Sequence, residues 1–326
     1  MAGVVAGSVI SNYGSYSPAV RLVALTVNNI CNLKCPHCYL QYTGPNQYFP
    51  QSLQETLLAQ PFEHLAIVGM EPFVNRKTAL STIELAERAR NAGKTVSAIT
   101  NGYGLKFLDA QACSLFDFID VSFDGGLETY TRFRSGDLAR LRESIDHVRS
   151  YGLPLNALHT LYQENIGNID DMLTVLQFYD FQKVLFSPYV ETMNEGKNCV
   201  GQVPLLNILK ALVQSEAFRQ EPKAYLLLDS YHYMSEKVDE ASVKAELARL
   251  KLSKKVHVVP HTPLQVGSIR VTYDGLIMSP ATALHTAMYK SERIKLGNES
   301  LAAAYQEFLE QERCISSSTL ALAAGA

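Results

Sequence analysis

The chain has 326 residues, a length that fits two ordinary domains or one α/β barrel with an appendage. Hydrophobic residues make up 47% of the sequence and charged residues 19%, which excludes disordered, collagen-like and coiled-coil proteins. The formal net charge is −3 and no long block of like charges occurs, so we expect no nucleic-acid partner. No apolar run is long enough to cross a bilayer, and the first 20 residues hold neither Lys nor Arg nor a secretory hydrophobic segment. We therefore expect a cytoplasmic protein without a membrane partner.

Short apolar runs alternate with helical patterns along the first two thirds of the chain. The predicted strands lie near 20–27, 64–68, 95–99, 119–123, 154–160 and 183–188. The predicted helices lie near 52–59, 77–92, 107–115, 137–151, 168–179 and 203–215. This alternation indicates parallel strands joined by right-handed helical crossovers, and six such units predict an α/β fold, a partial (β/α)6 barrel spanning residues 19–220.

Two of these helices carry start signals. Ser52 and Glu55 have the spacing of a capping box. Asp137 is a suitable N-cap for the helix that is expected to run to Tyr151.

The last third of the chain has a different character. A helical stretch near 236–252 precedes short strand-like segments at 255–259, 269–273 and 276–278. The dipeptide Asp274-Gly275 between the last two is a hairpin signal. We expect a small α+β extension at 221–315, preceded by an N-terminal extension at 1–18 and followed by a frayed tail at 316–326.

The six cysteines carry the strongest chemical signal. Cys31, Cys35 and Cys38 follow the first predicted strand with the spacing Cys-x3-Cys-x2-Cys. In a reducing compartment this spacing favours metal or redox chemistry over a disulfide framework. Three thiolates in one loop can hold three corners of an iron–sulfur cube, which normally takes four cysteines, and so leave one iron without a protein ligand. A structural zinc site is the alternative, although the second Cys pair that is typical of zinc sites is missing.

Four stretches resemble, in the same order, the motifs of the radical S-adenosylmethionine (SAM) superfamily. The loop from Cys31 to Tyr39 is similar to its cluster loop. Gly69-Met70-Glu71-Pro72 resembles its Gly-Gly-Glu-Pro segment, with Met in place of the second Gly, and Thr100-Asn101-Gly102 resembles its Thr-Asn-Gly. Val121-Ser122-Phe123-Asp124-Gly125, followed by Phe133-Arg134-Ser135-Gly136, resembles the Ser-Leu-Asp-Gly and Arg-Gly pair of the branch that carries SPASM or twitch domains.

The resemblance implies a radical SAM enzyme with one [4Fe–4S] cluster on Cys31, Cys35 and Cys38 and with SAM on the free iron. In the family, one electron from the cluster splits SAM into methionine and a 5′-deoxyadenosyl radical, which removes a hydrogen atom from the substrate. The electron would come from a donor such as flavodoxin or ferredoxin.

The resemblance also implies contacts with SAM. Gly69, Met70 and Glu71 should meet its amino group, although the Met70 side chain narrows the approach of the backbone. Ser122 and Arg134 should address the carboxylate or the ribose, because an Arg fork can make two charge-assisted hydrogen bonds to a carboxylate. Asn101 should lie near the ribose.

The carboxy-terminal region has a weaker resemblance to a SPASM or twitch domain. It covers the segment from Ile269 to Ile277, the tripeptide Leu296-Gly297-Asn298 and the predicted helix from Ser300 to Glu312. In that family this frame supplies cysteines for auxiliary clusters, but here Ser279-Pro280-Ala281 stands where a cysteine is expected, and no Cys lies between 199 and 314. We therefore expect a single cluster and a redox-neutral reaction such as epimerisation, rearrangement, elimination or cyclisation.

Polar residues near the ends of predicted strands five and six are the candidates for substrate binding. They are His159, Tyr189, Glu191 and Asn194. Cys199 lies a few residues further on and is either a hydrogen-atom donor, as in some epimerases of the superfamily, or a small buried hydrophobe.

The leading interpretation is a radical SAM enzyme that acts on a small molecule or a short peptide. Only 30 residues precede Cys31, which we take as too few for a cobalamin domain or a leader-binding module. A modifier of ribosomally made peptides is the alternative within the family. A zinc-stabilised binding protein and an inactive relative that keeps the cluster are the alternatives from other classes.

Overall fold

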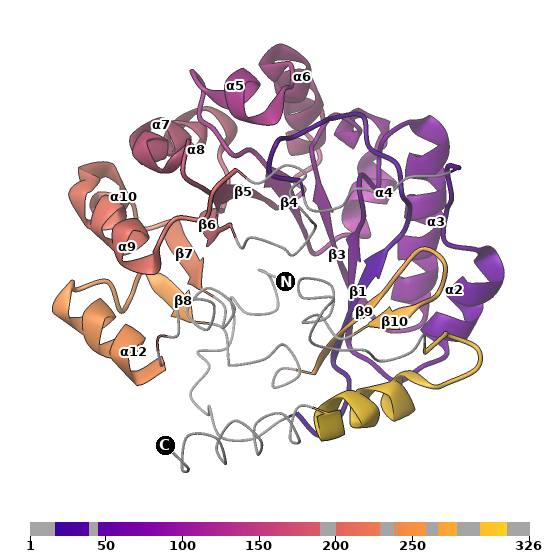
Figure 1. Ribbon diagram of the computed structural model, residues 1–326. Coiled ribbons are helices and arrows are strands. Elements are labelled where there is room, and N and C mark those ends of the chain that lie inside the picture. The colour runs from indigo at the N-terminus through magenta and orange to yellow at the C-terminus, as the bar shows by residue number, and fades with distance from the viewer. Residues whose placement is uncertain are drawn as a thin grey trace, which may run out of the picture.

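The computed structural model describes residues 17–38, 45–189, 200–228, 238, 240–258, 267–278 and 294–311. Within these ranges strands and helices alternate along the chain (Figure 1). The strands are β1 (Leu22–Thr26), β2 (His64–Val68), β3 (Thr95–Thr100), β4 (Phe118–Ser122), β5 (Leu155–Leu161), β6 (Lys183–Pro188), β7 (Ala224–Leu228), β8 (Val256–Val258), β9 (Ser268–Val271) and β10 (Ile277–Met278).

The helices follow the strands in chain order. They are α2 (Gln51–Leu58), α3 (Arg76–Asn91), the 3-10 turn η1 (Leu105–Phe107), α4 (Ala110–Ser114), α5 (Tyr130–Arg134), α6 (Leu138–Arg149), the 3-10 turn η2 (Ile166–Asn168), α7 (Ile169–Leu173), α8 (Val175–Tyr179), α9 (Leu205–Gln214), α10 (Glu216–Gln220), α12 (Glu240–Arg249) and a last helix over 301–311.

The strands form one curved sheet in the order β10-β9-β1-β2-β3-β4-β5-β6-β7-β8. All neighbouring pairs from β9 through β8 are parallel, and only β10 runs antiparallel to its neighbour β9. Figure 1 shows the helices on the outside of this open, partial barrel. Parallel strands end at the same edge, so the loops that follow β1 to β6 gather there.

Side-chain alternation along the strands separates the two faces of the sheet. Val23 and Leu25 of β1 point into the main core between the sheet and the helices, where both are fully buried. Leu22 and Ala24 point to the other face and form a small separate cluster with Ala66 of β2. The helix-covered face therefore holds the apolar core, and the concave face is left for other side chains.

The predicted α/β class and partial barrel are confirmed, and all six predicted strands are present. The sheet also contains β7, which the apolar pattern did not indicate. The strand-like segment at 269–273 is β9, which pairs with β1 from Leu22↔Ser268 to Leu25↔Val271. Gly275 adopts φ +81° in the predicted hairpin between β9 and β10. The expected tail at 316–326 lies outside the described residues.

The predicted helix starts had different outcomes. The Asp137 carboxylate accepts hydrogen bonds from the N–H groups of Ala139 and Arg140, which confirms it as the N-cap of α6. The capping box at Ser52 is wrong, because α2 begins at Gln51 after the extended residue Pro50 and no side chain caps it. Ser52 lies inside the first turn instead.

The longest helix among the described residues, α3, has 16 residues and packs one face onto the sheet. None of the helices in these ranges is long and apolar enough to cross a membrane.

Candidate functional site

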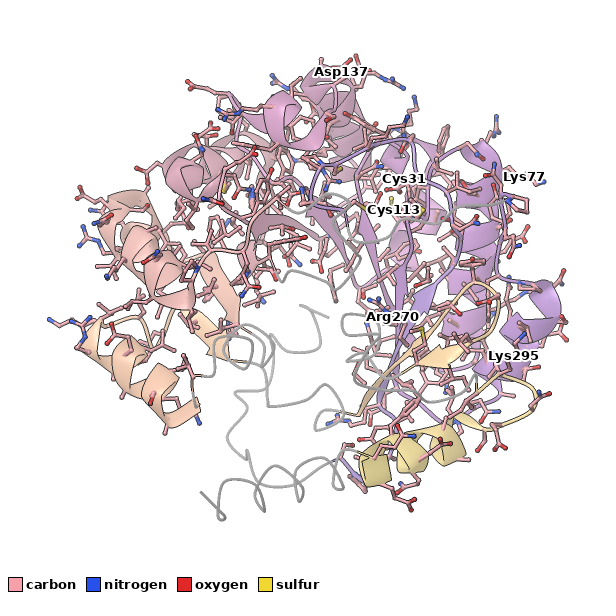
Figure 2. All side chains as sticks on the ribbon, in the orientation of Figure 1. Cys31, Lys77, Cys113, Asp137, Arg270 and Lys295 are labelled. Carbon is pink, nitrogen blue, oxygen red and sulfur yellow. The ribbon has the colours of Figure 1, made fainter. Side chains whose placement is uncertain are left out.

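The cluster loop, residues 31–38, begins beyond the carboxyl end of β1. Asn28 holds the start of this loop, because its Nδ2 donates to the Glu71 carbonyl at 2.8 Å and its Oδ1 accepts from the Ile30 N–H at 3.1 Å. The thiol of Cys35 is buried, and those of Cys31 and Cys38 are half-buried. Figure 2 shows Cys31 among the strands and helices of the amino-terminal half.

The three thiols of the cluster loop lie close enough to influence one another. The pKa of Cys35 is raised to about 12, mainly by burial, with smaller contributions from the charges of Cys38 and Cys31, while Arg134 lowers it. Burial likewise raises the pKa of Cys31, whereas a hydrogen bond from the Leu33 N–H, at 3.4 Å from its Sγ, lowers it. Without a metal these thiols therefore stay protonated, and a cation beside them would favour the thiolates.

Glu71 joins the loops that follow β2 and β3. Its Oε1 accepts from the Phe73 N–H at 3.0 Å and from the Thr100 hydroxyl at 2.6 Å, and its Oε2 accepts from the Asn101 N–H at 2.6 Å. Burial raises the pKa of Glu71, and these hydrogen bonds lower it. The carboxyl group is thus held by the chain itself, while Gly69 and Met70 before it are half-buried.

Asn101 joins the end of β3 to the cluster loop. Its Nδ2 lies 3.8 Å from the Cys31 Sγ and donates to the Asn32 Oδ1 at 2.7 Å. Its Oδ1 accepts from the Tyr103 N–H at 3.1 Å, which fixes the orientation of the amide. The next residue, Gly102, adopts φ +89°, and a Cβ there would lie 2.3 Å from the Leu141 side chain. This turn therefore requires glycine.

Asp124 is the centre of a buried charge network beyond β4. Its Oδ2 lies 2.6 Å from Arg134 Nη1 and 3.0 Å from His37 Nε2, and its Oδ1 accepts from the Thr160 N–H at 2.5 Å. Burial alone would raise the pKa of Asp124, but His37 and Arg134 outweigh it and hold this pKa well below its usual range. Asp124 adopts φ 54°, a conformation that brings its carboxylate under the cluster loop.

Arg134 also contacts the cluster loop through its backbone. The Cys35 thiol donates to the Arg134 carbonyl at 3.7 Å. The Arg134 Nε is buried and has no hydrogen-bond partner among the residues that the structure describes. A buried donor of this kind costs about 1–3 kcal/mol when it is left unpaired. Arg134 is therefore prepared to donate to a ligand.

Aromatic rings close the site on the β5 side. His37 stacks on Tyr162 with ring centroids 5.3 Å apart, and Phe133 meets the same ring edge-on at 6.0 Å. Tyr189, a predicted substrate residue, is buried in this small cluster with Phe133 and Tyr162. These rings exclude water from the neighbourhood of Asp124.

The structure differs from the expectation for His159. This side chain is fully buried on the helix-covered face, stacked on Phe186 at 5.3 Å and tilted against Phe123 at 6.1 Å. Burial lowers the pKa of His159 to about 4. The prediction that His159 contacts the substrate is therefore wrong. Because side chains alternate along a strand, Leu158 and Thr160 point to the concave face and His159 points to the helix-covered face.

The remaining predicted residues are placed as follows. Ser122 is the last residue of β4 and is half-buried. Glu191, Asn194 and Cys199 lie outside the described residues, as do Ser279-Pro280-Ala281 and Cys314. Cys113 is buried in α4 and belongs to the apolar core between the sheet and the helices.

Sequence reasoning missed the partners that connect the motifs. Asp124 and Thr100 lie inside the quoted motifs, but the resemblance assigns them no role, and His37 lies in the cluster loop between two candidate ligands. Their pairing joins residues far apart in the chain, so spacing alone carries no signal for it. Asn28 has no motif that would have pointed to it.

The cluster loop differs from a site for a single metal ion. In the described ranges no three His, Cys, Asp or Glu side chains converge as a single bound ion requires. An iron–sulfur cube is bound at separate corners, one thiolate to each iron, so its ligands do not converge on one point. Three thiols of one loop, with a backbone N–H and the Asn101 amide directed at Cys31, fit such a cube.

Comparison with known proteins shows what part of this chain resembles. Residues 25–176 match the model of the Radical SAM superfamily. The cofactors of this class are a [4Fe–4S] cluster and SAM.

Individual proteins are similar to this chain over different lengths. The pre-heme d1 synthase of Dinoroseobacter shibae is 26% identical over 181 residues, which are 52% of this chain and 43% of that protein. The match thus spans less than half the length of this curated relative.

Two solved structures share the fold. SuiB of Streptococcus suis bound to the precursor peptide SuiA has a TM-score of 0.60 at 10% identity, over 89% of this chain and 65% of that one. The enzyme anSMEcpe with bound AdoMet has a TM-score of 0.60 at 16% identity, over 88% of this chain and 80% of that one.

Proposed function

We propose that the enzyme holds a [4Fe–4S] cluster on Cys31, Cys35 and Cys38, cleaves SAM reductively and abstracts a hydrogen atom from a small-molecule or short-peptide substrate. One observation carries the proposal: the cluster loop is in direct contact with Asn101 from the β3 side and with Arg134 from the β4 side. Residues from two separate motifs thus contact the cluster loop at one edge of the sheet.

The cluster, when bound, supplies the electron that splits SAM into methionine and the 5′-deoxyadenosyl radical. The chain supports its thiolates with donors. The Leu33 N–H and the Asn101 amide both point at the Cys31 Sγ, and hydrogen bonds to a ligand sulfur raise the reduction potential of such a centre.

Arg134 is the residue that we assign to the SAM carboxylate. Its Nε is the buried donor without a partner described above, and Asp124 holds its Nη1, so the guanidinium cannot turn away. Although burial disfavours its charge, Asp124 keeps the pKa of Arg134 raised, so the cation persists at any working pH. Ser122, at the end of β4, would assist at the carboxylate or the ribose.

The loops after β2 and β3 would bind the other end of SAM. Glu71 fixes the backbone of its own loop, so the main-chain groups of Gly69 and Met70 are presented to the methionine amino group in a constant geometry. Asn101 holds the loop against Cys31 and is assigned to the ribose side. The ring cluster of Phe133, Tyr162 and Tyr189 keeps water from a reactive radical.

Several finer features belong to the same proposal. We assign a redox-neutral outcome, with Cys199 as the hydrogen-atom donor, an electron donor such as flavodoxin or ferredoxin, a cytoplasmic location and Glu191 and Asn194 near the substrate. The similarity to a pre-heme d1 synthase supports a small-molecule substrate. Modification of ribosomally made peptides is the second candidate, supported by the fold shared with SuiB in its complex with SuiA and with anSMEcpe in its complex with Cp18Cys peptide.

The test is SAM cleavage by anaerobically reconstituted protein under a strong reductant, with 5′-deoxyadenosine and methionine measured by mass spectrometry. We expect the wild type to form both products and Cys31→Ala to form neither. Cys113→Ala is the matched control, since Cys113 is a buried helix residue outside the site, and it should retain cleavage. Full cleavage by Cys31→Ala would contradict the proposal.

A further inference from the structure

Three polar residues form a row across the concave face of the sheet. Asp120 of β4 is in register with Asn156 of β5, and Asn156 is in register with Lys183 of β6. Residues in register on neighbouring strands lie about 5 Å apart and point to the same face. The neighbours of Asp120 in β4, Ile119 and Val121, belong to the helix-covered core. Asp120, Asn156 and Lys183, here called the polar row, therefore face away from the helices.

The polar row lies directly below the site proposed for SAM. Asp120 and Ser122 alternate on the same face of β4, and two residues of a strand span about 7 Å. On the β3 side Asp120 is in register with Ile99, which lies two residues before Asn101. The polar row is thus one pleat deeper in the barrel than the edge that carries Ser122 and Asn101.

The hydrogen bonding of the polar row is incomplete. Asn156 Nδ2 donates to Asp120 Oδ1 at 2.9 Å. Because a carboxylate only accepts, this bond fixes the amide with its oxygen directed elsewhere. The Asn156 Oδ1 is buried and has no hydrogen-bond partner in the part of the chain that the structure describes. A buried acceptor without a hydrogen bond costs about 1–3 kcal/mol of stability. A ligand that donates a hydrogen bond to the Asn156 Oδ1 would remove this cost.

The charges of the polar row define which donor fits. Burial raises the pKa of Asp120, while the hydrogen bond from Asn156 and the positive charge of Lys183 lower it. Asp120 and Lys183 flank Asn156 on the two neighbouring strands, and the charge of Lys183 acts on Asp120. A ligand that carried only a cation would be repelled by Lys183, and one that carried only anions would be repelled by Asp120. The complementary ligand carries one group of each sign.

We propose that the polar row binds the head of a zwitterionic α-amino acid, with the ammonium on Asp120 and Asn156 Oδ1 and the carboxylate on Lys183. An ammonium has three donors and no acceptor, which suits two neighbouring acceptor oxygens. This inference deepens the proposed function and rests on it, because it names the substrate class that would be held beneath SAM.

The test uses three probes of one carbon skeleton: L-leucine, 3-methylbutylamine, which lacks the carboxylate, and 4-methylpentanoate, which lacks the ammonium. Binding is measured by calorimetry on cluster-loaded protein saturated with SAM, so that the methionine site is blocked. We expect L-leucine to bind at least about tenfold more tightly than either other probe. Equal binding of the three, or tightest binding of 4-methylpentanoate, would overturn the inference.

Two variants separate the two ends of the ligand. Asp120→Asn, which keeps the shape of the side chain, should reduce L-leucine binding to the level of 4-methylpentanoate. Lys183→Met should reduce it to the level of 3-methylbutylamine. Asp146→Asn, an exposed carboxylate on α6, is the control and should leave all three affinities unchanged. If Asp120→Asn or Lys183→Met still bound L-leucine more tightly than the other two probes, as the wild type is expected to do, the inference would be overturned.

Two measurements on the same protein, SAM cleavage and ligand binding, separate this inference from the proposed function. Failure of the wild type to form 5′-deoxyadenosine contradicts the proposed function, whereas calorimetry needs no radical step. Selective L-leucine binding that both variants weaken supports the polar row whatever the cleavage result. Because Asp120→Asn removes a charge from a buried pair, its folding is checked by its thermal unfolding. If it does not fold, Lys183→Met decides the question.

Discussion

Arg134 Nη1 lies 2.6 Å from Asp124 Oδ2, and both side chains are almost completely buried. Such a pair is costly to desolvate, and removing one partner leaves an uncompensated charge. Here the pair also includes His37, so the cluster loop, the end of β4 and the Arg134 segment share one carboxylate.

Asp124→Asn should therefore weaken SAM binding and lower stability together. We expect the dissociation constant for SAM to rise by about tenfold or more, because Arg134 loses the group that orients it. The free energy of unfolding should fall by about 3 kcal/mol or more. Equilibrium dialysis with labelled SAM and urea unfolding measure the two effects.

Arg132→Gln is the control for this prediction. Arg132 lies two residues before Arg134 but is exposed, with its guanidinium 5.1 Å from the Phe133 ring centroid, so its loss should leave SAM affinity unchanged and lower stability by no more than about 1 kcal/mol. If folded Asp124→Asn bound SAM with the wild-type affinity, Asp124 would not be needed to orient Arg134.

Asn101→Ala should alter the cluster without removing it. The amide directed at the Cys31 Sγ stabilises negative charge on sulfur, so its loss should shift the reduction potential of the cluster to more negative values. The iron content should stay at the wild-type level, because all three thiols remain. A redox titration followed by electron paramagnetic resonance measures the potential. An unchanged potential would show that the contact has no electronic role.

His159 should make the protein sensitive to acid. Burial lowers the pKa of His159 in the folded state to about 4, from the usual 6.5. Between pH 4 and pH 6.5, His159 is therefore protonated in the unfolded chain but neutral in the folded chain. The stability that its neutral form contributes is present above pH 6.5 and is lost as the pH falls toward 4, by about 3 kcal/mol. His159→Phe, which keeps an aromatic ring between Phe123 and Phe186, should lose less stability over the same pH range. The measurement is urea unfolding of both proteins at pH 7 and pH 4.5, and equal losses would contradict the assignment.

Gly102→Ala should destabilise the turn that carries Asn101. The new Cβ would meet the Leu141 side chain at 2.3 Å and would have to tolerate φ +89°. We expect a loss of about 2 kcal/mol or more. Gly93→Ala separates the two causes, because Gly93 has φ +75° but nothing within 4 Å of the added Cβ. Gly93→Ala should lower the free energy of unfolding by about 1–2 kcal/mol, which is the cost of the left-handed backbone conformation alone. Equal thermal stabilities of the two variants would show that Leu141 is not in the way.

The sequence allowed the barrel to be predicted because each of its first six strands is a short segment rich in apolar residues that alternates with a helical pattern. β7, Ala224–Leu228, was not predicted, because its sequence is rich in leucine, which favours helices at least as much as strands. The motifs located the cluster loop, Glu71, Asn101 and Arg134, since motif residues are close in sequence. The Asp124 network and the polar row depend on register between strands. A shift of one residue in β5 would have put Leu155 or Ala157, not Asn156, beside Asp120, and apolar patterning does not fix register to that accuracy.

The pairing of β1 has a consequence for how the protein is made. β1 carries the cluster loop at its end, and its second neighbour, β9, is encoded some 240 residues later. During synthesis on the ribosome, the backbone groups of β1 that pair with β9 stay unpaired until residue 271 has emerged. An unpaired strand edge of this kind can form hydrogen bonds with another nascent chain. A chain cut short before β9 would therefore be expected to aggregate before it could receive iron.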